Sequence, residues 1–517
     1  MELLLENGII VDGNGGAPET GSVLIRDGRI AEIIPAGSEM PAIAAIDCSG
    51  LVVAPGFVDV HAHSDYEVIE GLSNKILQGV TTEIVGNCSY SLFPMRPESN
   101  LAQLGSVYAD LPPLTLTSAG DYFSAVETAR PLLNVAALTG HSALRSYVMG
   151  MERRPPSPHE QRAMEQLLEQ SLEDGSIGFS TGLNLLPCSF AEFEELVSLC
   201  RILKRYRAYY TTHMRDYKFR VVEAVQEAIR LAEEGETAVQ LSHVQTVGKK
   251  CWGYLDTILE MVDAAARRGV DIGMDAYPYL AGSCSIVQLL PEWCQAGGLK
   301  ALLERLESPS QRDRIARETE DYMSNTWADI VISGVRREST ETLLGRSVEE
   351  IGEHRGATAR DTALELLREQ EGHLDIISFN SRDENLRKVL CHPLTSVCTD
   401  SHVAKGLSHP RTFGTYPTFL GKYVRELRWM PIEAAIVKTS ALPARRFQLQ
   451  GRGTIAAGNW ADIVVFNAAT ITTKSDYSSP TEPPEGIRMV LVNGEIVVRN
   501  GKLTDARPGA ALRHTSS

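Results

Sequence analysis

The stretch Ala54-Pro55-Gly56-Phe57-Val58-Asp59-Val60-His61-Ala62-His63 decides how the rest of the chain is interpreted. It is an apolar strand that ends in two histidines separated by one residue. Side chains alternate between the two faces of a strand, so His61 and His63 point to the same side. Two imidazoles on one face can hold one divalent cation, although two hydrogen-bonded histidines would give the same pattern.

Further apolar segments of strand length follow this one and alternate with helical patterns. Such alternation is typical of a parallel sheet, and eight strands close a barrel. The sequence therefore predicts an α/β protein built on a (β/α)₈ TIM barrel. Segments 330–332 and 376–379 remain as spare strand candidates. The expected barrel strands lie near residues 52–60, 81–85, 134–138, 177–180, 208–213, 238–243, 271–277 and 395–400.

The two ends of the chain show a different pattern from the middle. Alternating segments there meet at Asp27-Gly28 and at Asn493-Gly494, pairs that suit hairpin turns with positive φ. We expect residues 1–53 and 452–505 to form one small β-sandwich, since chain ends commonly lie close together. The barrel is then expected to occupy residues 54–451.

One interval inside the expected barrel is too long for a single strand-helix unit. Residues 281–394 separate the last two strands, and we interpret 283–347 as an inserted lid over the barrel mouth. The last residues of the chain, 506–517, are predicted to be a flexible tail.

Composition and charge narrow the class of protein. The chain has 517 residues, of which 43% are hydrophobic and 22% charged, as in ordinary globular α/β proteins. Its net charge of −16 argues against nucleic acid or an anionic membrane as partner, so a small-molecule substrate is expected. Neither a signal peptide nor a long apolar span is evident, and the nine cysteines form no CxxC pair. A cytoplasmic protein with reduced thiols is expected.

More side chains that can bind metals follow other predicted strands at the same end. Cys88 ends the second strand, His213 the fifth, His243 the sixth and Asp400 the eighth. Each one alone is more often a structural residue, because a free cysteine behaves as a small buried hydrophobe. Their order at the catalytic face of a barrel is hard to obtain from packing alone. We therefore predict a metal site built from His61, His63, Cys88, His213, His243 and Asp400.

The ordered set resembles the amidohydrolase superfamily, and the neighbouring sequence is similar to its N-acyl-D-amino-acid deacylase (D-aminoacylase) branch. The resemblance spans essentially the whole chain. It implies a zinc-dependent hydrolase that cleaves the linear amide bond of an N-acylated amino acid or a related small molecule. Matching passages include Gly86-Asn87-Cys88, Gly140-His141-Ser142-Ala143-Leu144-Arg145, Ser180-Thr181-Gly182-Leu183, Asp275-Ala276-Tyr277-Pro278-Tyr279 and Gly451-Arg452-Gly453-Thr454-Ile455.

The same resemblance implies roles for the predicted ligands. Cys88, His213 and His243 would hold one tightly bound Zn²⁺, in a branch that uses this cysteine instead of a carbamylated lysine. The other three candidates would form a second, weaker or empty site, with Asp400 as general base and acid. Bound zinc lowers the pKa of water toward about 7 and polarises the amide carbonyl, while the carboxylate carries the proton.

Five further side chains are candidates for substrate contact: His141, Leu185, Gln245, Tyr277 and Arg411. Tyr277 or His141 would donate to the oxyanion, the alternatives being a packed barrel tyrosine and a histidine that braces its loop. Arg411 either grips an anion or fixes its own loop. Gln245 and Leu185 replace a lysine and a tyrosine of the family, which lowers affinity for a carboxylate. We hypothesise that the substrate differs from a simple N-acyl-D-amino acid and lacks a free carboxylate.

Other functions are compatible with the same fold. A cyclic amidohydrolase, a dipeptidase or a lyase-like enzyme would use the same metal ligands on another bond. A binding or scaffold protein without activity is a further alternative, because fold alone does not specify function. The presence of all six candidate ligands argues against that last possibility. Stereochemistry, the number of bound metals and the oligomeric state are left open.

Overall fold

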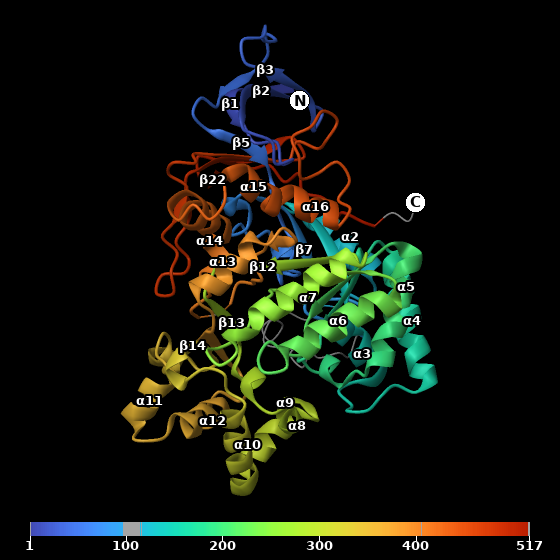
Figure 1. The fold of residues 1–517 in the computed structure, drawn as a ribbon, viewed down its shortest axis with the longest axis vertical. Helices are drawn as coiled ribbons and strands as arrows, with labels where there is room; N and C mark the ends of the chain where they lie inside the picture. The colour runs from blue at the N-terminus through green and yellow to red at the C-terminus, as the bar shows by residue number, and fades with distance from the viewer. Residues whose placement is uncertain (1, 97–113, 115, 405, 515–517) are drawn as a thin grey trace.

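A barrel of eight parallel strands forms the middle of the molecule in the computed structural model, which describes residues 2–96, 114, 116–404 and 406–514 (Figure 1). Its strands are β6 (Phe57–Asp59), β7 (Val80–Val85), β8 (Asn134–Gly140), β9 (Gly178–Gly182), β10 (Tyr209–His213), β11 (Ala238–Leu241), β12 (Ile272–Ala276) and β16 (Thr395–Val397). They pair in chain order from β6 to β16. Ala62 bridges to Ser401, and the Asp400 N–H donates to the His61 carbonyl at 2.8 Å, which brings the two outer strands together. The predicted (β/α)₈ barrel is confirmed.

Helices follow the strands and cover the barrel from outside. Helix α4 shows why they form where they do: Ser157 and Glu160 make a capping box, and Pro158 occupies the first turn. Its Met164 and Leu168 side chains are fully buried. The other barrel helices are α2 (Ala119–Ala129), α3 (His141–Met149), α5 (Phe193–Tyr206), α6 (Val221–Gly235), α7 (Leu255–Arg267) and α13 (Asp383–Cys391); α4 itself spans Pro158–Glu173.

Both ends of the chain join in one mixed sheet of nine strands at one end of the molecule (Figure 1). The junction is β5, which pairs in parallel with β1 from the N-terminal part and antiparallel with β17 from the C-terminal part. Asp27-Gly28 and Asn493-Gly494 form its turns, all four residues having positive φ. The strands are β1 (Glu2–Ile10), β2 (Glu19–Arg26), β3 (Arg29–Pro35), β4 (Ala45–Asp47), β5 (Val52–Pro55), β17 (Ile463–Phe466), β20 (Ile487–Val492), β21 (Glu495–Arg499) and β22 (Lys502–Leu503).

A separate packed unit lies between β12 and β16 in the chain, at the far end from that sheet (Figure 1). Its hydrophobic cluster runs from Ile286 to Ile376 and is distinct from the barrel core. The unit continues past residue 347, the expected end of the lid, because β15 pairs with both β13 and β14. Its elements are β13 (Ala281–Ser285), α8 (Glu292–Gln295), α9 (Gly298–Glu307), α10 (Pro309–Asp321), β14 (Ile330–Val335), α11 (Val348–Arg355), α12 (Ala359–Glu369) and β15 (Leu374–Phe379).

Residues 510–514 pack on the barrel, although they belong to the segment 506–517 that was expected to be a flexible tail. Ala511 bridges to Val135 at the start of β8, and the Leu512 N–H donates to the Val135 carbonyl at 2.7 Å. The His514 N–H reaches the Gly175 carbonyl at 2.8 Å. These backbone bonds satisfy groups that would otherwise face water and hold the segment in place. Residues 515–517 lie outside the described part of the chain.

After β16 the chain returns to the end sheet through three short helices, α14 (Arg411–Thr418), α15 (Ile432–Ile436) and α16 (Leu442–Arg446). Within the residues described, no helix combines the length and apolar character needed to cross a membrane.

Candidate metal centre

All six predicted ligands lie at the carboxyl end of the barrel strands. His213 is the last residue of β10, and the others follow the ends of β6, β7, β11 and β16 by two to four residues. Carboxyl ends of parallel strands meet at one face of a barrel, which is why residues distant in the chain come together there.

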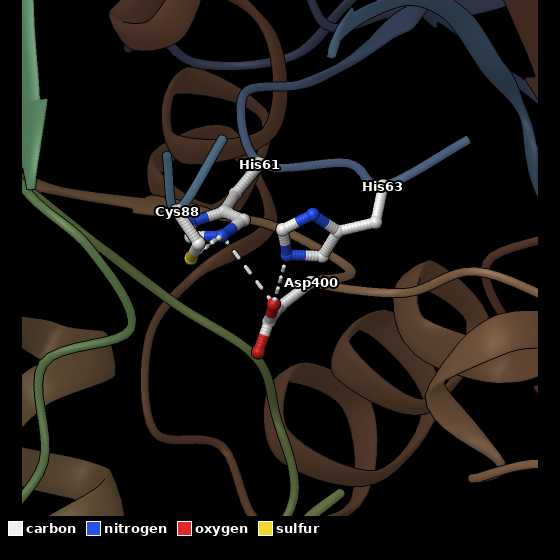
Figure 2. A group of neighbouring side chains, drawn as sticks. All are labelled: His61, His63, Cys88 and Asp400. Carbon is white, nitrogen blue, oxygen red and sulfur yellow. Dashed lines mark hydrogen bonds and ion pairs between the residues drawn. The ribbon is translucent and has the colours of Figure 1, made fainter. Parts of the chain in front are cut away.

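One group of side chains surrounds Asp400 (Figure 2). The ligand atoms of His61, His63, Cys88 and Asp400 all lie within 4.8 Å of one another. His61 Nε2 is 3.1 Å from Cys88 Sγ and 3.3 Å from Asp400 Oδ1. His63 Nε2 is 3.1 Å from the same carboxylate oxygen. Four side chains from three strand ends thus converge on one point.

A second group shares the cysteine. The ligand atoms of Cys88, His213 and His243 also lie within 4.8 Å of one another, and Cys88 Sγ is 3.6 Å from His243 Nε2. His213 Nε2, His243 Nδ1 and His63 Nδ1 are buried and have no hydrogen-bond partner among the described residues. A thiol with several imidazoles, some of whose nitrogens are unpaired, is the donor set that suits zinc. The residues present therefore fit a divalent metal.

The electrostatics keep the sulfur and the carboxylate in their ligand forms. Burial opposes ionisation of Cys88, but His61 and the neighbouring His213 and His243 hold the pKa of its thiol well below the usual value. Burial likewise opposes ionisation of Asp400, yet Arg411 and His61 hold the pKa of that carboxyl well below its usual value. Both groups are therefore anionic near neutral pH, as metal binding requires.

Three of the six residues have a positive φ, a backbone conformation that residues other than glycine rarely adopt. Their φ angles are 51° at Cys88, 34° at His243 and 48° at Asp400. The chain allows this where backbone groups are well bonded: the His243 N–H donates to Asp275 Oδ1 at 2.7 Å. Upstream, Gly86 has φ 79°, and a Cβ there would lie 2.2 Å from the Leu138 carbonyl oxygen. Non-glycine residues with positive φ cluster at functional sites.

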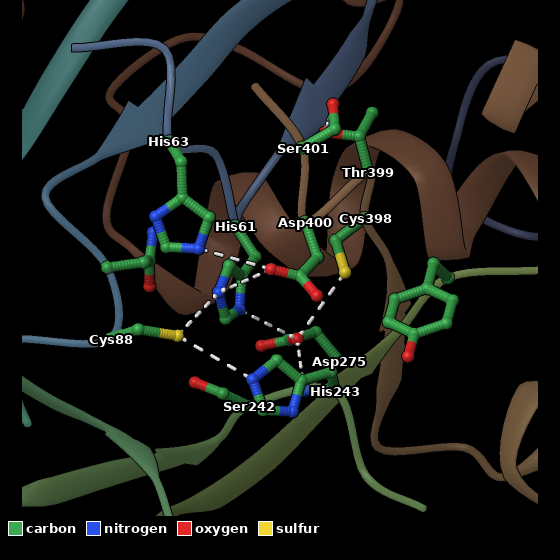
Figure 3. Close-up of polar contacts among 12 residues, drawn as sticks. His61, His63, Cys88, Ser242, His243, Asp275, Cys398, Thr399, Asp400 and Ser401 are labelled. Carbon is green, nitrogen blue, oxygen red and sulfur yellow. Dashed lines mark hydrogen bonds and ion pairs between the residues drawn. The ribbon is translucent and has the colours of Figure 1, made fainter. Parts of the chain in front are cut away.

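Asp275 belongs to this site, although the sequence did not mark it as a site residue (Figure 3). It lies in the strand β12, one residue before the strand ends at Ala276, and is 1% exposed. Its Oδ1 lies 3.2 Å from His61 Nδ1 and accepts the His243 N–H. Gln240 Nε2 donates to the other oxygen at 3.1 Å. Its place at the end of the seventh predicted strand, where the ligands of the other strands lie, could have identified it as a site residue. The passage Asp275-Ala276-Tyr277-Pro278-Tyr279 was quoted above for its similarity to the family, with no role given to Asp275.

Three predicted substrate residues lie beside the six-residue cluster. Arg411 Nη1 donates to Asp400 Oδ2 at 2.8 Å, and its guanidinium lies 4.7 Å from the ring centroid of Tyr277. Gln245 Nε2 donates to the Tyr277 hydroxyl at 3.1 Å. Arg411 thus contacts the candidate general base, and Tyr277 connects it to Gln245.

The other two predicted substrate residues are engaged elsewhere. His141 Nδ1 lies 2.9 Å from Cys188 Sγ, and its Nε2 lies 2.9 Å from Glu195 Oε1. With both ring nitrogens occupied, these contacts fit a histidine that braces its loop rather than an oxyanion donor. Leu185 is 5% exposed and packs in the hydrophobic core.

Comparison with known proteins places these features in context. The sequence model of the amidohydrolase family matches residues 44–498. The chain is 35% identical to the N-acyl-D-glutamate deacylase of Alcaligenes xylosoxydans xylosoxydans, covering 100% of this chain and 97% of that protein. A Bordetella bronchiseptica N-acyl-D-glutamate deacylase, complexed with zinc and a phosphonate mimic of the tetrahedral intermediate, superposes with TM-score 0.85 at 33% identity, covering 99% of each chain. A D-aminoacylase with a binuclear metal centre gives 0.84 at 31%, again covering 99% of each.

Proposed function

Because the chain belongs to the amidohydrolase family, in its N-acyl-D-amino-acid deacylase branch, we propose that it is a zinc enzyme that hydrolyses the linear amide bond of an N-acylated amino acid. The observation that carries the proposal is the convergence of Cys88, His213 and His243, whose ligand atoms lie within 4.8 Å of one another. Those residues come from three different strand ends, and the structural relatives include a zinc complex.

The metal would be held first by Cys88, His213 and His243. One thiolate and two imidazoles leave a fourth position open, as in catalytic zinc sites. When bound there, zinc supplies a water of lowered pKa and polarises the amide carbonyl. His61, His63 and Asp400 would make a second, weaker site that shares Cys88 with the first. The D-aminoacylase relative is described in terms of activation by one metal and attenuation by a second, which supports unequal sites.

Asp400 would move the proton. Its Oδ1 faces His61 and His63, and its Oδ2 accepts a hydrogen bond from Arg411. The carboxylate is ionised, so it can take a proton from the attacking water and return it to the leaving amine. Arg411 would hold the orientation of this carboxylate, since a guanidinium is planar and keeps its charge. The Tyr277 hydroxyl, which accepts a hydrogen bond from Gln245, would donate to a developing oxyanion.

The test combines zinc analysis with a substrate panel. Purified protein is assayed for bound zinc and for turnover of N-acetyl-D- and L-amino acids, dipeptides and cyclic amides, with products identified by mass spectrometry. Cys88→Ala is expected to lose zinc and activity, whereas Asp400→Ala is expected to keep zinc and lose activity. Cys391→Ala, which removes an exposed cysteine, is the matched control and should behave as the native protein. Retention of both zinc and activity in Cys88→Ala would contradict the proposal.

A further inference from the structure

A second cluster of reactive side chains lies outside the metal centre, beside the ends of β8 and β9. Cys188 Sγ is 2.9 Å from His141 Nδ1, and His141 Nε2 is 2.9 Å from Glu195 Oε1. His141 begins α3, Cys188 begins the short helical turn Cys188–Phe190, and Glu195 lies on α5. All three are buried, and we call them the thiol cluster. The hydrolysis proposed above uses none of them, although a cysteine, a histidine and a carboxylate in this order are the groups of an activated nucleophile.

The hydrogen bonds of the thiol cluster favour an ionised sulfur. Arg145 Nη1 donates to both oxygens of Glu195, at 2.7 and 2.6 Å, which keeps that carboxylate charged. Burial opposes protonation of His141, but Cys188 and Glu195 raise the pKa of this imidazole to about 9. On its other side, Cys188 Sγ accepts the Gly182 N–H at 3.3 Å. A protonated imidazole and a backbone N–H thus both donate to the sulfur, as a thiolate requires.

A second buried cysteine, Cys200 on α5, shows what the imidazole adds. Cys188 and Cys200 are both 0% exposed. Burial raises the pKa of the Cys200 thiol well above its usual value, which leaves that sulfur protonated and inert. Cys188 combines the same burial with a partner that takes its proton, so it is a nucleophile that only a small reagent can reach. Hydrogen peroxide is such a reagent, since it has two heavy atoms and forms hydrogen bonds as water does.

We propose that Cys188 is a second reactive thiol of this protein, which a small peroxide oxidises to a sulfenic acid, and that this oxidation loosens the metal centre. The thiolate sulfur attacks one oxygen of the peroxide, and the O–O bond breaks. The leaving hydroxide takes the proton from His141 Nδ1 and becomes water. The sulfur is oxidised by two electrons and the peroxide is reduced by the same two.

The end of β9 connects the thiol cluster to the metal ligands. Gly182, which donates to Cys188, is followed by Leu183, whose N–H donates to the His213 carbonyl at 2.9 Å. A Cβ at Gly182 would lie 2.5 Å from the Cys88 carbonyl oxygen, so the backbone there has no room to move toward Cys88. An oxygen added to a fully buried sulfur needs space in a close-packed interior. The added atom therefore displaces Gly182 and with it the backbone that supports Cys88 and His213.

The first experiment compares the oxidation of two cysteines in one sample. Zinc-loaded native protein is treated with hydrogen peroxide, quenched with catalase and denatured in a cyclic diketone that traps sulfenic acids, and the labelled peptides are identified by mass spectrometry. We expect Cys188 to be labelled roughly tenfold faster than Cys200 or more, because the thiolate and not the thiol is the nucleophile. Labelling of Cys188 no faster than that of Cys200 would overturn the proposal. This comparison needs no variant.

A variant then tests the part played by the imidazole. His141→Asn keeps a side chain that can donate to the sulfur but cannot take its proton, and should slow the labelling of Cys188 about tenfold. His159→Asn makes the same change at an exposed histidine of α4 and should leave the labelling rate unchanged. If folded His141→Asn were labelled at Cys188 as fast as the native protein, the ion pair would not activate the sulfur and the proposal would fail.

Zinc release tests the connection to the metal centre. Under the same peroxide treatment, the native protein should release zinc roughly tenfold faster than Cys188→Ala, as expected when the support of metal ligands is disturbed. Both proteins keep Cys88, so its own oxidation contributes equally to the two rates. Cys200→Ala, which removes the other buried thiol, is the matched control and should release zinc as the native protein does. Equal release from the native protein and Cys188→Ala would refute the connection to the metal centre.

Discussion

Replacement of Asp275 by asparagine should weaken zinc binding without unfolding the protein. The carboxylate of Asp275 faces His61 Nδ1 and accepts the His243 N–H at one oxygen, and it accepts Gln240 Nε2 at the other. The introduced asparagine keeps the shape of the side chain and can retain the first two contacts through its own oxygen. Its amide group would face Gln240, whose Oε1 is buried without a partner among the described residues and can accept after rotation of the side-chain amide. The variant therefore removes one charge and little else.

The size of the effect follows from those two hydrogen bonds. A hydrogen bond to a charged acceptor contributes about 1.5–3 kcal/mol and one to a neutral acceptor about 1 kcal/mol. Loss of the charge at residue 275 should therefore weaken each of the bonds to His61 and His243 by about 1 kcal/mol. Two weakened bonds amount to about 2 kcal/mol, or roughly a 30-fold loss of zinc affinity, within the range typical of partners that orient metal ligands.

Competition with a chromophoric chelator measures this affinity directly, and circular dichroism checks the fold. Asp256→Asn, at an exposed carboxylate on α7 that pairs with Lys388, is the matched control and should bind zinc as the native protein does. If Asp275→Asn bound zinc within twofold of the native affinity, Asp275 would not orient the ligands and the reasoning would fail.

Two further predictions concern stability. Burial raises the pKa of Glu67 to about 7. The folded protein then holds this proton more tightly than the unfolded chain, so the free energy of unfolding should fall by up to about 3 kcal/mol between pH 4 and 7. Chemical denaturation at several pH values should show that Glu67→Gln removes this loss, whereas the control Glu70→Gln, at an exposed residue, should keep it. If the unfolding free energy of Glu67→Gln fell with pH as steeply as that of the native protein, the prediction would be wrong. The second change, Glu195→Gln, leaves Arg145 buried without the carboxylate partner that lies 2.6 Å away, and should lower the free energy of unfolding by about 3–5 kcal/mol. The zinc content of the folded fraction should not change. A loss of unfolding free energy below about 1 kcal/mol would contradict this prediction.

The barrel and the positions of its predicted ligands were accessible from sequence because both follow simple periodicities. The strand β7 is buried at every position, as expected for a parallel strand with helices on its outer face. His61 and His63 share a side because strand side chains alternate. Turn pairs such as Asn493-Gly494 also identified hairpins that the structure contains. Local rules of this kind need no knowledge of distant contacts.

Features that depend on distant contacts were harder to predict. The inserted unit runs to Phe379 because β15 pairs with strands on both sides, and nothing local to residues 374–379 indicates those partners. His141 looked like a site residue, but Glu195 and Cys188 occupy its ring. Residues 510–514 have no strand pattern of their own and are ordered by backbone bonds to β8 and Gly175.

The left-handed backbone conformations at the metal centre depend both on local strand pattern and on distant contacts. Cys88, His243 and Asp400 all have positive φ and all follow the end of a barrel strand. Such a conformation costs about 1 kcal/mol or more at a residue with a side chain, so each must be stabilised by its surroundings. For Asp400 the bond is its N–H to the His61 carbonyl, which is also part of barrel closure; for His243 it is the N–H bond to Asp275. The geometry of the ligands thus depends on closing the barrel, which explains why the strand pattern predicts where they lie but not how they are held.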